Sequence, residues 1–461
     1  MKKKIMALTC ICLAASFALA GCGKKLEQEG KINISVGDWP SEENKSALEL
    51  ALKNKERMET QHPEVNVIPD TYGWDVKTFN MKASSGQLPN LFVVALTEIK
   101  NLIKSGYVAD ITDSMKEFGY DTAVNPDLLD IVTEDGKIYG IPRAGYINGL
   151  YIDKKLFREA GLVNDDGSIK YPTTYDELAE YGQIIKEKTG VSGFALPTTN
   201  NCGGWHFLNI AWSYGVEFME QTDDGKWKAT FNTPECKKAL EYVHDLQWKY
   251  GILPDDKVID QVGLYQIFGT YRTAMMIADP PCQRLFQNFG MNKDDVMVVS
   301  MPAGPAGAYT QMGGDVYMMS SKTTPEQQKA CYQWMEVIGF SPNYTEDRIA
   351  AIHKSNETTK EKNGIVLPRD TIDIWTSPEA LAAKNKIMEE DANVKLEDYE
   401  KYFGFDGVKI HTEYPRCSQE LYAVFDKVLQ EIITNENADI DALLEQATTD
   451  FQANHLDKID Y

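Results

Sequence analysis

The segment GKIYGIPRAGYINGLYIDKKLFREAGL, residues 136–162, decides the fold because its apolar spacing changes twice. Residues 138–141 are apolar or aromatic apart from one glycine, which predicts a buried strand that Pro142 closes. In residues 150–153 the aliphatic side chains alternate with Tyr and Asp, which is the period of a half-buried strand. The segment therefore predicts two strands joined by a polar and aromatic connection.

A short helix is predicted directly after the second strand. Asp153 can cap its N-terminus, and Leu156, Phe157 and Ala160 fall on one helical face. Gly161 supplies a stop, because glycine readily adopts the left-handed conformation that ends many helices. A strand that leads into a capped helix is typical of α/β proteins.

The preceding part of the chain continues this alternation. Residues 31–39 and 64–70 predict strands, and residues 90–96 form a continuous apolar strand that we expect to be buried on both faces. Residues 41–62 predict a helix between the first two strands, with Ser41 as its cap.

The C-terminal part adds helices. Residues 323–340 carry a complete start signal, with Thr324 at the cap, Pro325 at the first position and Gln327 completing a capping box. About the last 60 residues predict amphipathic helices, whose apolar stripe comprises Leu421, Val424, Phe425, Val428, Ile432 and Ile433. The whole pattern predicts α/β sheets covered by helices.

The N-terminus predicts export. Three lysines precede an apolar stretch too short to span a bilayer, and Leu19-Ala20-Gly21 then precedes Cys22. Residues 1–21 are similar to a lipoprotein signal peptide, in which Cys22 becomes the lipidated first residue, and residues 22–30 are a polar tether. A plain secretory signal is the alternative. We expect an extracytoplasmic chain, lipid-anchored to the bacterial cell membrane.

Composition excludes several function classes. The 461 residues are 43% hydrophobic, so the chain is globular and long enough for two lobes. Its net charge is −22, and removal of residues 1–21 with their three lysines makes it more negative. Such a charge repels nucleic acid and anionic membrane surfaces, so the membrane contact we expect is the lipid anchor alone.

The remaining cysteines indicate no metal site. Five follow Cys22, an odd number without any C-x-x-C spacing: Cys202, Cys236, Cys282, Cys331 and Cys417. Buried free thiols are the expected state, and a disulfide among them stays open.

Nearly the whole mature chain, from residue 31 to about 450, carries a family resemblance. The ordered segments that carry it are ISVGDW, QHPEVNV, GQLPNLFVV, SGYVADIT, the segment quoted above, YPTTYDELAEYGQIIKEKTG, GTYRTAMMI, VMVVSMPAGPAG and GGDVYMMSSKTTPEQQKACYQWMEVIGF. Their order resembles that of the carbohydrate-type extracellular solute-binding lipoproteins of ABC importers. The resemblance implies a type II periplasmic-binding-protein-like clamshell with the ligand cleft between two lobes. Residues 31–142 and 301–352 would form lobe one, and residues 143–300 and 353–461 lobe two.

The resemblance also implies partners. The chain would act as a monomer that captures a carbohydrate, with an oligosaccharide as the first choice, and delivers it to the permease subunits of an ABC transporter, with no cofactor. Residues after Pro142 would form the first crossing between the lobes and line the cleft, among them Arg143, Tyr146 and Asn148, with Tyr151 equally consistent with packing. Sugar rings stack on aromatic faces, and their hydroxyls bind Asp, Asn and Arg.

Further cleft residues are expected where strands end. They are Asp38, Trp39, Trp74, Trp205, Asp279, Gly313, Gly314, Asp315, Tyr414 and Arg416, of which Trp39 and Trp205 are the main candidates. Sugar-binding relatives commonly carry a tryptophan where this chain has Asp279. Trp212, Trp248 and Trp334 lie within helical periodicity and predict core positions, and His206 beside Trp205 is more often a packed residue.

Other functions have weaker support. The sequence has no G-x-S-x-G elbow, P-loop or H-E-x-x-H motif. Paired acids such as Asp165-Asp166 and Asp223-Asp224 precede glycine and predict turns rather than the carboxylates of a glycosidase, and no calcium-loop ladder is present. A secreted lipoprotein hydrolase and a structural adhesin are therefore less favoured. Within the binding class, Arg143 and Arg416 keep a phosphorylated polyol or another organic anion open as the ligand.

Overall fold

The computed structural model describes residues 26–75, 78–368, 372–404 and 407–459. The larger of its sheets has seven strands in the order β12-β13-β3-β1-β2, with β6 and β14 also paired to β13. Its strands are β1 (Ile32–Val36), β2 (Val65–Pro69), β3 (Leu91–Ala95), β6 (Gly140–Ile147), β12 (Ala303–Gly304), β13 (Gly307–Met319) and β14 (Val408–Thr412). The predicted lipidation site, Cys22, lies outside the described residues.

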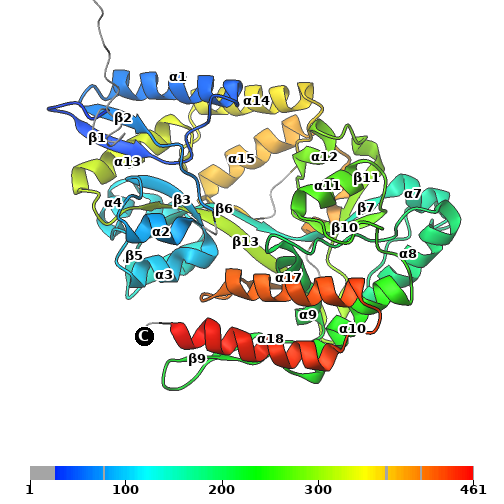
Figure 1. Cartoon of the computed structure of the whole chain (residues 1–461). Helices are drawn as coiled ribbons and strands as arrows, with labels where there is room; N and C mark the ends of the chain where they lie inside the picture. The colour runs from blue at the N-terminus through cyan, green and yellow to red at the C-terminus, as the bar shows by residue number, and fades with distance from the viewer. Residues whose placement is uncertain (1–25, 76–77, 369–371, 405–406, 460–461) are drawn as a thin grey trace, which may run out of the picture.

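A second sheet of three antiparallel strands has β7 (Gly149–Asp153) at its centre. Its neighbours are β10 (Met275–Ala278) and β11 (Val296–Val299). Two small hairpins pair β4 (Thr133–Glu134) with β5 (Lys137–Ile138) and β8 (Met219–Gln221) with β9 (Trp227–Ala229). In Figure 1, β6 and β13 run from the elements around β1–β3 to those around β7 and β10, so they join the two sheets.

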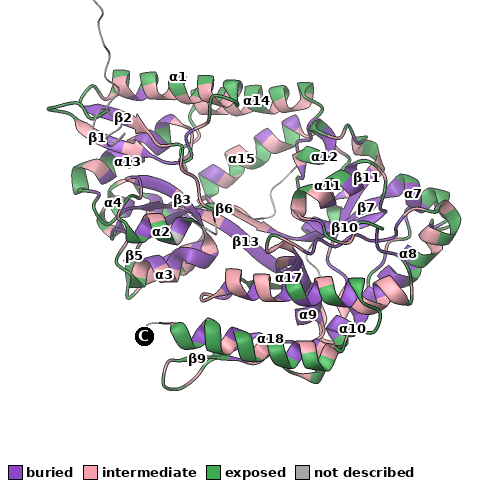
Figure 2. Ribbon diagram, in the orientation of Figure 1, coloured by how far each residue is buried: buried purple, intermediate pink, exposed green. Residues whose placement is uncertain are grey.

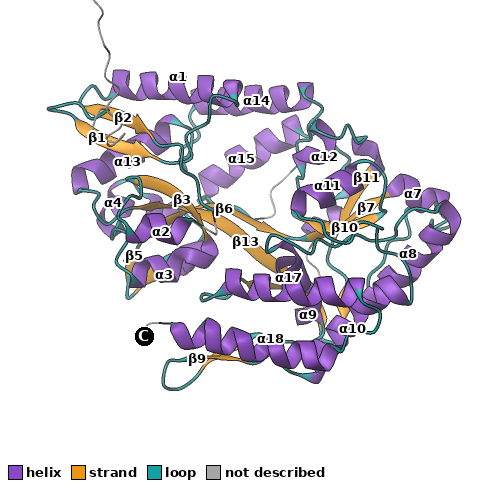
Figure 3. Cartoon of the chain, in the orientation of Figure 1, coloured by secondary structure: helices purple, strands orange, loops and turns teal. Residues whose placement is uncertain are grey.

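Helices cover both sheets (Figure 3). Those of the first half are α1 (Lys45–Gln61), α2 (Phe79–Ser84), α3 (Ile99–Lys104), α4 (Thr112–Glu117), α5 (Tyr120–Ala123), α6 (Pro126–Ile131), α7 (Lys154–Glu159), α8 (Tyr175–Thr189) and α9 (Cys202–Ser213). Those of the second half are α10 (Pro234–Trp248), α11 (Gln261–Gly269), α12 (Gln283–Gln287), α13 (Pro325–Val337), α14 (Glu346–Glu361), α15 (Pro378–Asp391), α16 (Glu400–Phe403), α17 (Ser418–Thr434) and α18 (Ile440–Asn454). No helix among the described residues combines the length and apolar character needed to cross a membrane.

The opening segment differs from its prediction in two respects. Pro142 does not close the strand, because β6 continues to Ile147. Ala144 opposes Asp315 of β13 while Pro142 opposes Val316, so Arg143 is the extra residue of a β-bulge. A bulge tolerates the missing N–H of proline inside a sheet. Strand β7 is buried on both faces rather than half-buried, because it lies between two neighbouring strands with packed residues above and below.

The helix starts mostly follow the sequence. The Asp153 carboxylate accepts hydrogen bonds from two backbone N–H groups of α7, and Gly161 has a φ of +79°. The capping box at Thr324 and Gln327 is confirmed. Ser41 does not cap α1; the chain stays irregular for three more residues, and the Asn44 side chain accepts the bond from the N–H of Ala47 at 3.4 Å.

Buried side chains form separate hydrophobic clusters (Figure 2). One surrounds the first sheet and draws on residues 34–141 and 316–337, with two later residues. Another lies beside β7 and draws on residues 150–301 and 414–456. A third packs against the opposite face of β7, which carries Tyr151. This distribution resembles the predicted lobes, whose exact boundaries stay a prediction.

The tryptophans predicted to pack in cores do so to different extents. Trp212 and Trp334 are buried, and Trp248 is half-buried with its indole N–H donating to the carbonyl of Ile432 at 2.8 Å. The five described cysteines are free, and three of them are buried.

Candidate functional site

The site is built around Tyr146, near the end of β6. Tyr146 lies opposite Gly313 of β13, and a methyl group at Gly313 would come within 2.6 Å of the tyrosine ring. Glycine therefore leaves the space that this ring occupies. Gly314 was predicted to contact the ligand, but its place in the structure indicates a role in strand packing. A methyl group at Gly314 would lie 2.3 Å from the carbonyl oxygen of Ala144, so glycine permits β6 and β13 to approach each other.

Trp205 completes an aromatic pair with Tyr146. It lies in the first turn of α9, its ring centroid is 6.4 Å from that of Tyr146, and the ring planes are tilted by 57°. Both side chains are half-buried. Residues 59 positions apart in the sequence thus present two aromatic rings at one place, and such rings can stack on the apolar face of a ligand.

Glu413, which sequence reasoning did not select, lies beside this pair. The hydroxyl of Tyr422 donates to its carboxylate at 2.8 Å. Burial raises the pKa of Glu413 to about 7, while hydrogen bonds from Tyr422 and Trp205 act in the opposite direction. Its only sequence signal was its place next to the selected Tyr414, because the strand that precedes it, β14, lies in a stretch for which the sequence predicted helices.

A second polar group lies at the bulge of β6. The guanidinium of Arg143 is 3.0 Å from the carboxylate of Asp315, and its charge also acts on Asp38. Burial raises the pKa of Asp315, and Arg143 lowers it in part. Asp38 has a φ of +54° and its pKa is raised by desolvation. The structure thus brings three predicted residues from β6, β13 and the end of β1 together.

Asp279 follows β10 and is half-buried. Burial raises its pKa. Burial also raises the pKa of Tyr146 well above its ordinary value, with the charges of Glu413, Asp279 and Asp315 adding to the effect. Three carboxylates from three different elements therefore act on one tyrosine hydroxyl.

Asn148 lies in the turn between β6 and β7 and is 1% exposed. Neither its amide nitrogen nor its amide oxygen has a hydrogen-bond partner. The Oε1 of the fully buried Gln311 and the Oδ1 of Asp315 also lack partners. Buried polar atoms are normally satisfied, so each of these groups is available to bond a water molecule or a ligand.

Two predicted cleft aromatics lie in cores instead. Trp39 is 7% exposed and stacks on Trp334, with ring centroids 6.0 Å apart. Tyr414 is 6% exposed; its hydroxyl accepts from Trp212 and donates to Glu217 at 2.8 Å. Neither ring is open to a ligand. Both side chains pack inward, because a neighbouring helix presents an apolar surface to each of them.

The remaining predicted residues lie at the margin or in the interior. The Arg416 guanidinium donates to the side chain of Asn101 in α3 at 2.5 Å. Trp74 is half-buried against the first-sheet cluster, with its Nε1 unpartnered. Tyr151 is fully buried. His206 is also fully buried; burial lowers its pKa to about 4 and its Nε2 faces Gln261.

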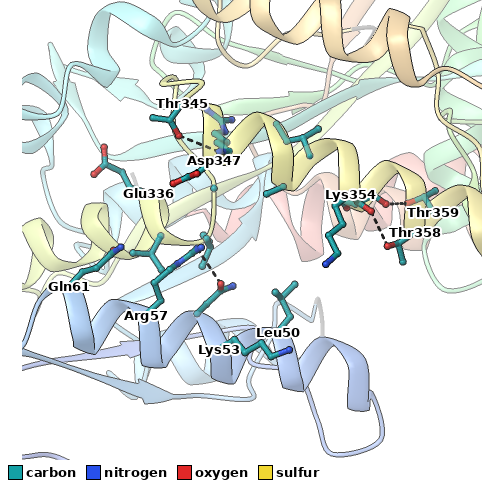
Figure 4. Close-up of a pocket in the computed structure, with 18 of the residues that line it drawn as sticks. Leu50, Lys53, Arg57, Gln61, Glu336, Thr345, Asp347, Lys354, Thr358 and Thr359 are labelled. Carbon is teal, nitrogen blue, oxygen red and sulfur yellow. Dashed lines mark hydrogen bonds between the residues drawn. The ribbon is translucent and has the colours of Figure 1, made fainter.

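A large cavity of about 1070 Å³ lies elsewhere, between α1, α13 and α14 (Figure 4). Leu50 and Arg57 line its α1 side, and Lys354 and Thr358 its α14 side. None of the predicted ligand residues lines it. Among the described residues, no three His, Cys, Asp or Glu side chains converge as metal ligands.

Comparison with known proteins assigns the chain to a wider group. The family model described as bacterial extracellular solute-binding protein matches residues 54–355. A putative binding protein of Brucella abortus is 23% identical over 286 residues, which cover 60% of this chain and 65% of that protein. The chain thus spans less than two thirds of that relative. The maltodextrin-binding protein MdxE of Bacillus subtilis is 23% identical over 401 residues, covering 80% of this chain and 90% of that protein.

Solved structures show the fold. Maltose-bound MalE3 of T. maritima has a TM-score of 0.65 at 18% identity, covering 91% of this chain and 99% of that one. UgpB of Mycobacterium tuberculosis in complex with glycerophosphocholine also has a TM-score of 0.65, at 15% identity, covering 92% and 98%. These likenesses confirm the predicted α/β clamshell of two lobes. Because one of these proteins holds a sugar and the other a phosphodiester, the fold alone does not select a ligand.

Proposed function

The chain belongs to the bacterial extracellular solute-binding proteins, and from this premise we propose that it captures a carbohydrate, most simply an oligosaccharide, and delivers it to an ABC importer. The maltodextrin-binding relative supports a carbohydrate ligand. Family members bind solutes rather than transform them, so we propose that the chain is not an enzyme. Its partners would be the sugar and the permease subunits.

The observation that carries the proposal is the aromatic pair Tyr146–Trp205 beside Glu413, Asp279 and Asp315. A sugar has apolar C–H faces and a belt of hydroxyl groups. Two tilted rings suit the faces, and carboxylates accept hydrogen bonds from the hydroxyls. The proposed ligand residues are therefore Asp38, Arg143, Tyr146, Asn148, Trp205, Asp279, Asp315 and Glu413, with Trp74 and Arg416 at the margin and Gly313 and Gly314 shaping the floor.

We propose that the lobes close on this ligand. Arg416, which lies two residues before α17, bonds Asn101 of α3, and Gln419 of α17 approaches Thr97 at 3.5 Å, so segments assigned to different lobes already touch. A ligand held by residues of both lobes favours the closed form by its differential affinity for it. Lobe one would comprise residues 31–142 and 301–352, as the family resemblance implies.

Attachment to the membrane is a separate part of the proposal. We propose that residues 1–21 are removed, that Cys22 carries the lipid and that the monomeric protein stays tethered outside the cytoplasm. The extracellular character of the family supports this location. Two acyl chains on one thioether lipid are sufficient for stable anchoring.

The alternative of an anionic ligand has less support. It was suggested by Arg143, by Arg416 and by the absence of a tryptophan near Asp279, and of these Arg143 is paired with the carboxylate of Asp315. A hydrolase is not favoured either, because the Asp165-Asp166 and Asp223-Asp224 pairs lie in exposed turns.

Binding assays test the proposal. Titration of the purified protein with a panel of neutral oligosaccharides should raise the melting temperature, since a ligand at one hundred times its Kd adds about 2.7 kcal/mol to folding stability. Trp205→Ala should weaken binding by about 1–3 kcal/mol, the scale of one large apolar contact. Trp227→Ala, a half-buried tryptophan on β9, is the matched control and should leave affinity unchanged. If no carbohydrate binds, or if both variants lose affinity equally, the proposal fails.

A further inference from the structure

Helix α9, which carries Trp205 in its first turn, has no cap of its own. The residue before it, Asn201, has a φ of +66°, and the Asn201 side chain makes no capping hydrogen bond. The first turn also contains Gly203 and Gly204, and glycine is the poorest helix former after proline. Local interactions alone therefore stabilise only weakly the turn that presents Trp205.

The two glycines are required by the neighbouring helix, α17. A methyl group at Gly204 would lie 2.3 Å from the backbone carbonyl oxygen of Tyr422, and one at Gly203 would lie 2.7 Å from a carboxylate oxygen of Asp426. The first turn of α9 is thus in direct contact with α17, and alanine, the better helix former, does not fit at either position.

Asp426 of α17 supplies the missing cap from a distant part of the chain. Its Oδ2 accepts a hydrogen bond from the N–H of Asn201 at 2.6 Å, and its Oδ1 accepts one from the N–H of Gly204 at 2.9 Å. Asp426 is 6% exposed, so these bonds are shielded from water. A carboxylate at a helix N-terminus also interacts favourably with the positive end of the helix dipole. Asp426 therefore acts as the cap of α9, although 225 positions separate it from Asn201.

The connection from this cap to Trp205 is short. The backbone N–H of Trp205 donates to the carbonyl oxygen of Asn201 at 3.1 Å, which is the first hydrogen bond of the helix. The side-chain amide of Asn201 donates to the carbonyl oxygen of Gln419 in α17 at 3.1 Å. Without the Asp426 carboxylate, two backbone N–H groups would be buried without a partner, which favours opening of the first turn. The Trp205 ring would then lose its fixed orientation in the aromatic pair.

We propose that Asp426 is a positioning residue of the carbohydrate site: it holds the first turn of α9 so that Trp205 stays beside Tyr146, and it does not itself contact the ligand. The inference rests on the proposed function for its effect on affinity, because Trp205 is one of the proposed ligand residues. Its effect on the Trp205 ring needs no ligand. The two effects are therefore measured separately.

The ligand-free measurement uses Asp426→Asn, which keeps the size of the side chain but replaces one acceptor oxygen with an NH₂ group. Asp153→Asn is the matched control, because Asp153 is also a buried carboxylate that accepts two backbone N–H groups, at the start of α7. In fluorine NMR of protein labelled with 5-fluorotryptophan, the Trp205 line, identified by its absence in Trp205→Phe, should shift and broaden in Asp426→Asn alone. The lines of Trp212 in α9 and of Trp248, which bonds α17, should not change.

A double-mutant cycle then tests whether the effect on affinity passes through Trp205. The probe is the tightest-binding sugar of a neutral panel that includes maltotriose and N,N′-diacetylchitobiose. Asp426→Asn should weaken its binding about fivefold, the typical effect of losing a helix cap, and Asp426→Ala should weaken it more. In the Trp205→Ala background, the same two substitutions should change the affinity by less than about twofold. Asp153→Asn should lower the melting temperature and leave the affinity unchanged.

Three results would overturn the inference. The first is an unchanged Trp205 line in Asp426→Asn, and the second is an affinity loss of the same size with and without the Trp205 ring. The third is an equal change in the Trp212 and Trp248 lines, which would show a general loosening of both helices. If no sugar of the panel binds the parent protein, the proposed function fails, and the Trp205 line alone decides whether Asp426 positions the ring.

Discussion

A single added methyl group at Gly313 tests whether Tyr146 belongs to the binding site. The substitution Gly313→Ala would bring the new carbon to 2.6–2.7 Å from three atoms at the end of the tyrosine ring. Gly313 does not have a positive φ, so the backbone accepts alanine without strain. The substitution therefore affects only the ring of Tyr146, which has to move away until its atoms are at an ordinary van der Waals distance from the new methyl group.

The required shift is about 0.8 Å, since ordinary contacts begin at 3.4 Å. Binding groups lose efficiency once displaced by more than about 0.5 Å from their productive position. We expect affinity for a carbohydrate to fall by about 1–2 kcal/mol, which is about five- to thirtyfold in Kd. The melting temperature should change little, because Tyr146 is half-buried and its ring lies at the free end of the side chain.

Gly314→Ala is the matched comparison. Its methyl group would meet the carbonyl oxygen of Ala144 at 2.3 Å, and a strand backbone cannot retreat as a side chain can. This variant should lose stability rather than affinity. Isothermal titration with the best sugar of the panel and thermal unfolding separate the two effects. Unchanged affinity in Gly313→Ala, or the same phenotype in both variants, would refute the assignment of Tyr146 to the ligand site.

Three further predictions follow from other parts of the chain. Trp39→Ala should lower the unfolding free energy by about 3–5 kcal/mol in urea titrations, because this ring is buried against Trp334, and an unaltered stability would contradict its core position. Burial raises the pKa of Glu98 and of Glu413 to about 7, so each of these two carboxyls holds more protons in the folded chain than in the unfolded chain between about pH 4.5 and 7. Their contribution to stability should therefore be greatest at the acid end of this window and fall as the pH rises through it, by up to about 1.4 kcal/mol per pH unit for each group, while His206, whose pKa burial lowers to about 4, opposes them below about pH 6.5; Glu98→Gln should reduce the fall with pH measured by urea unfolding. Cys22→Ser should appear in the medium or as unprocessed precursor on cell fractionation, whereas wild-type behaviour would exclude the lipid anchor.

Local signals in the sequence predicted local structure well. Helix ends can be predicted locally, because the backbone groups left unbonded there are satisfied by residues a few positions away. This holds for Asp153 at the start of α7 and for the capping box of Thr324 and Gln327. Ser41 does not cap α1, because Asn44, three residues later, accepts the hydrogen bond of the first turn instead. The two-lobed fold could be predicted because the order of many segments along the chain resembles that of a known family.

The site was predicted only in part. Sequence reasoning placed Arg143, Tyr146 and Trp205 in the cleft, and the structure brings Tyr146 and Trp205 together and pairs Arg143 with Asp315. Whether they bind a ligand stays a prediction. Sequence reasoning selected Tyr414 and missed its neighbour Glu413, because in an irregular segment the alternation of polar and apolar residues does not show which side chain faces the interior.

What the sequence determined by itself is therefore many of the helices and buried strands, since these depend on periodicity and caps within a few residues, while the two-lobed fold was implied by the family resemblance. Only the tertiary structure decided that Trp39 turns to Trp334 while Trp205 turns to Tyr146. Both tryptophans are large apolar rings near the ends of predicted elements, so their local preferences are alike. The direction of each ring is set by the apolar surface that a distant segment brings next to it, which is a property of packing and not of spacing along the chain.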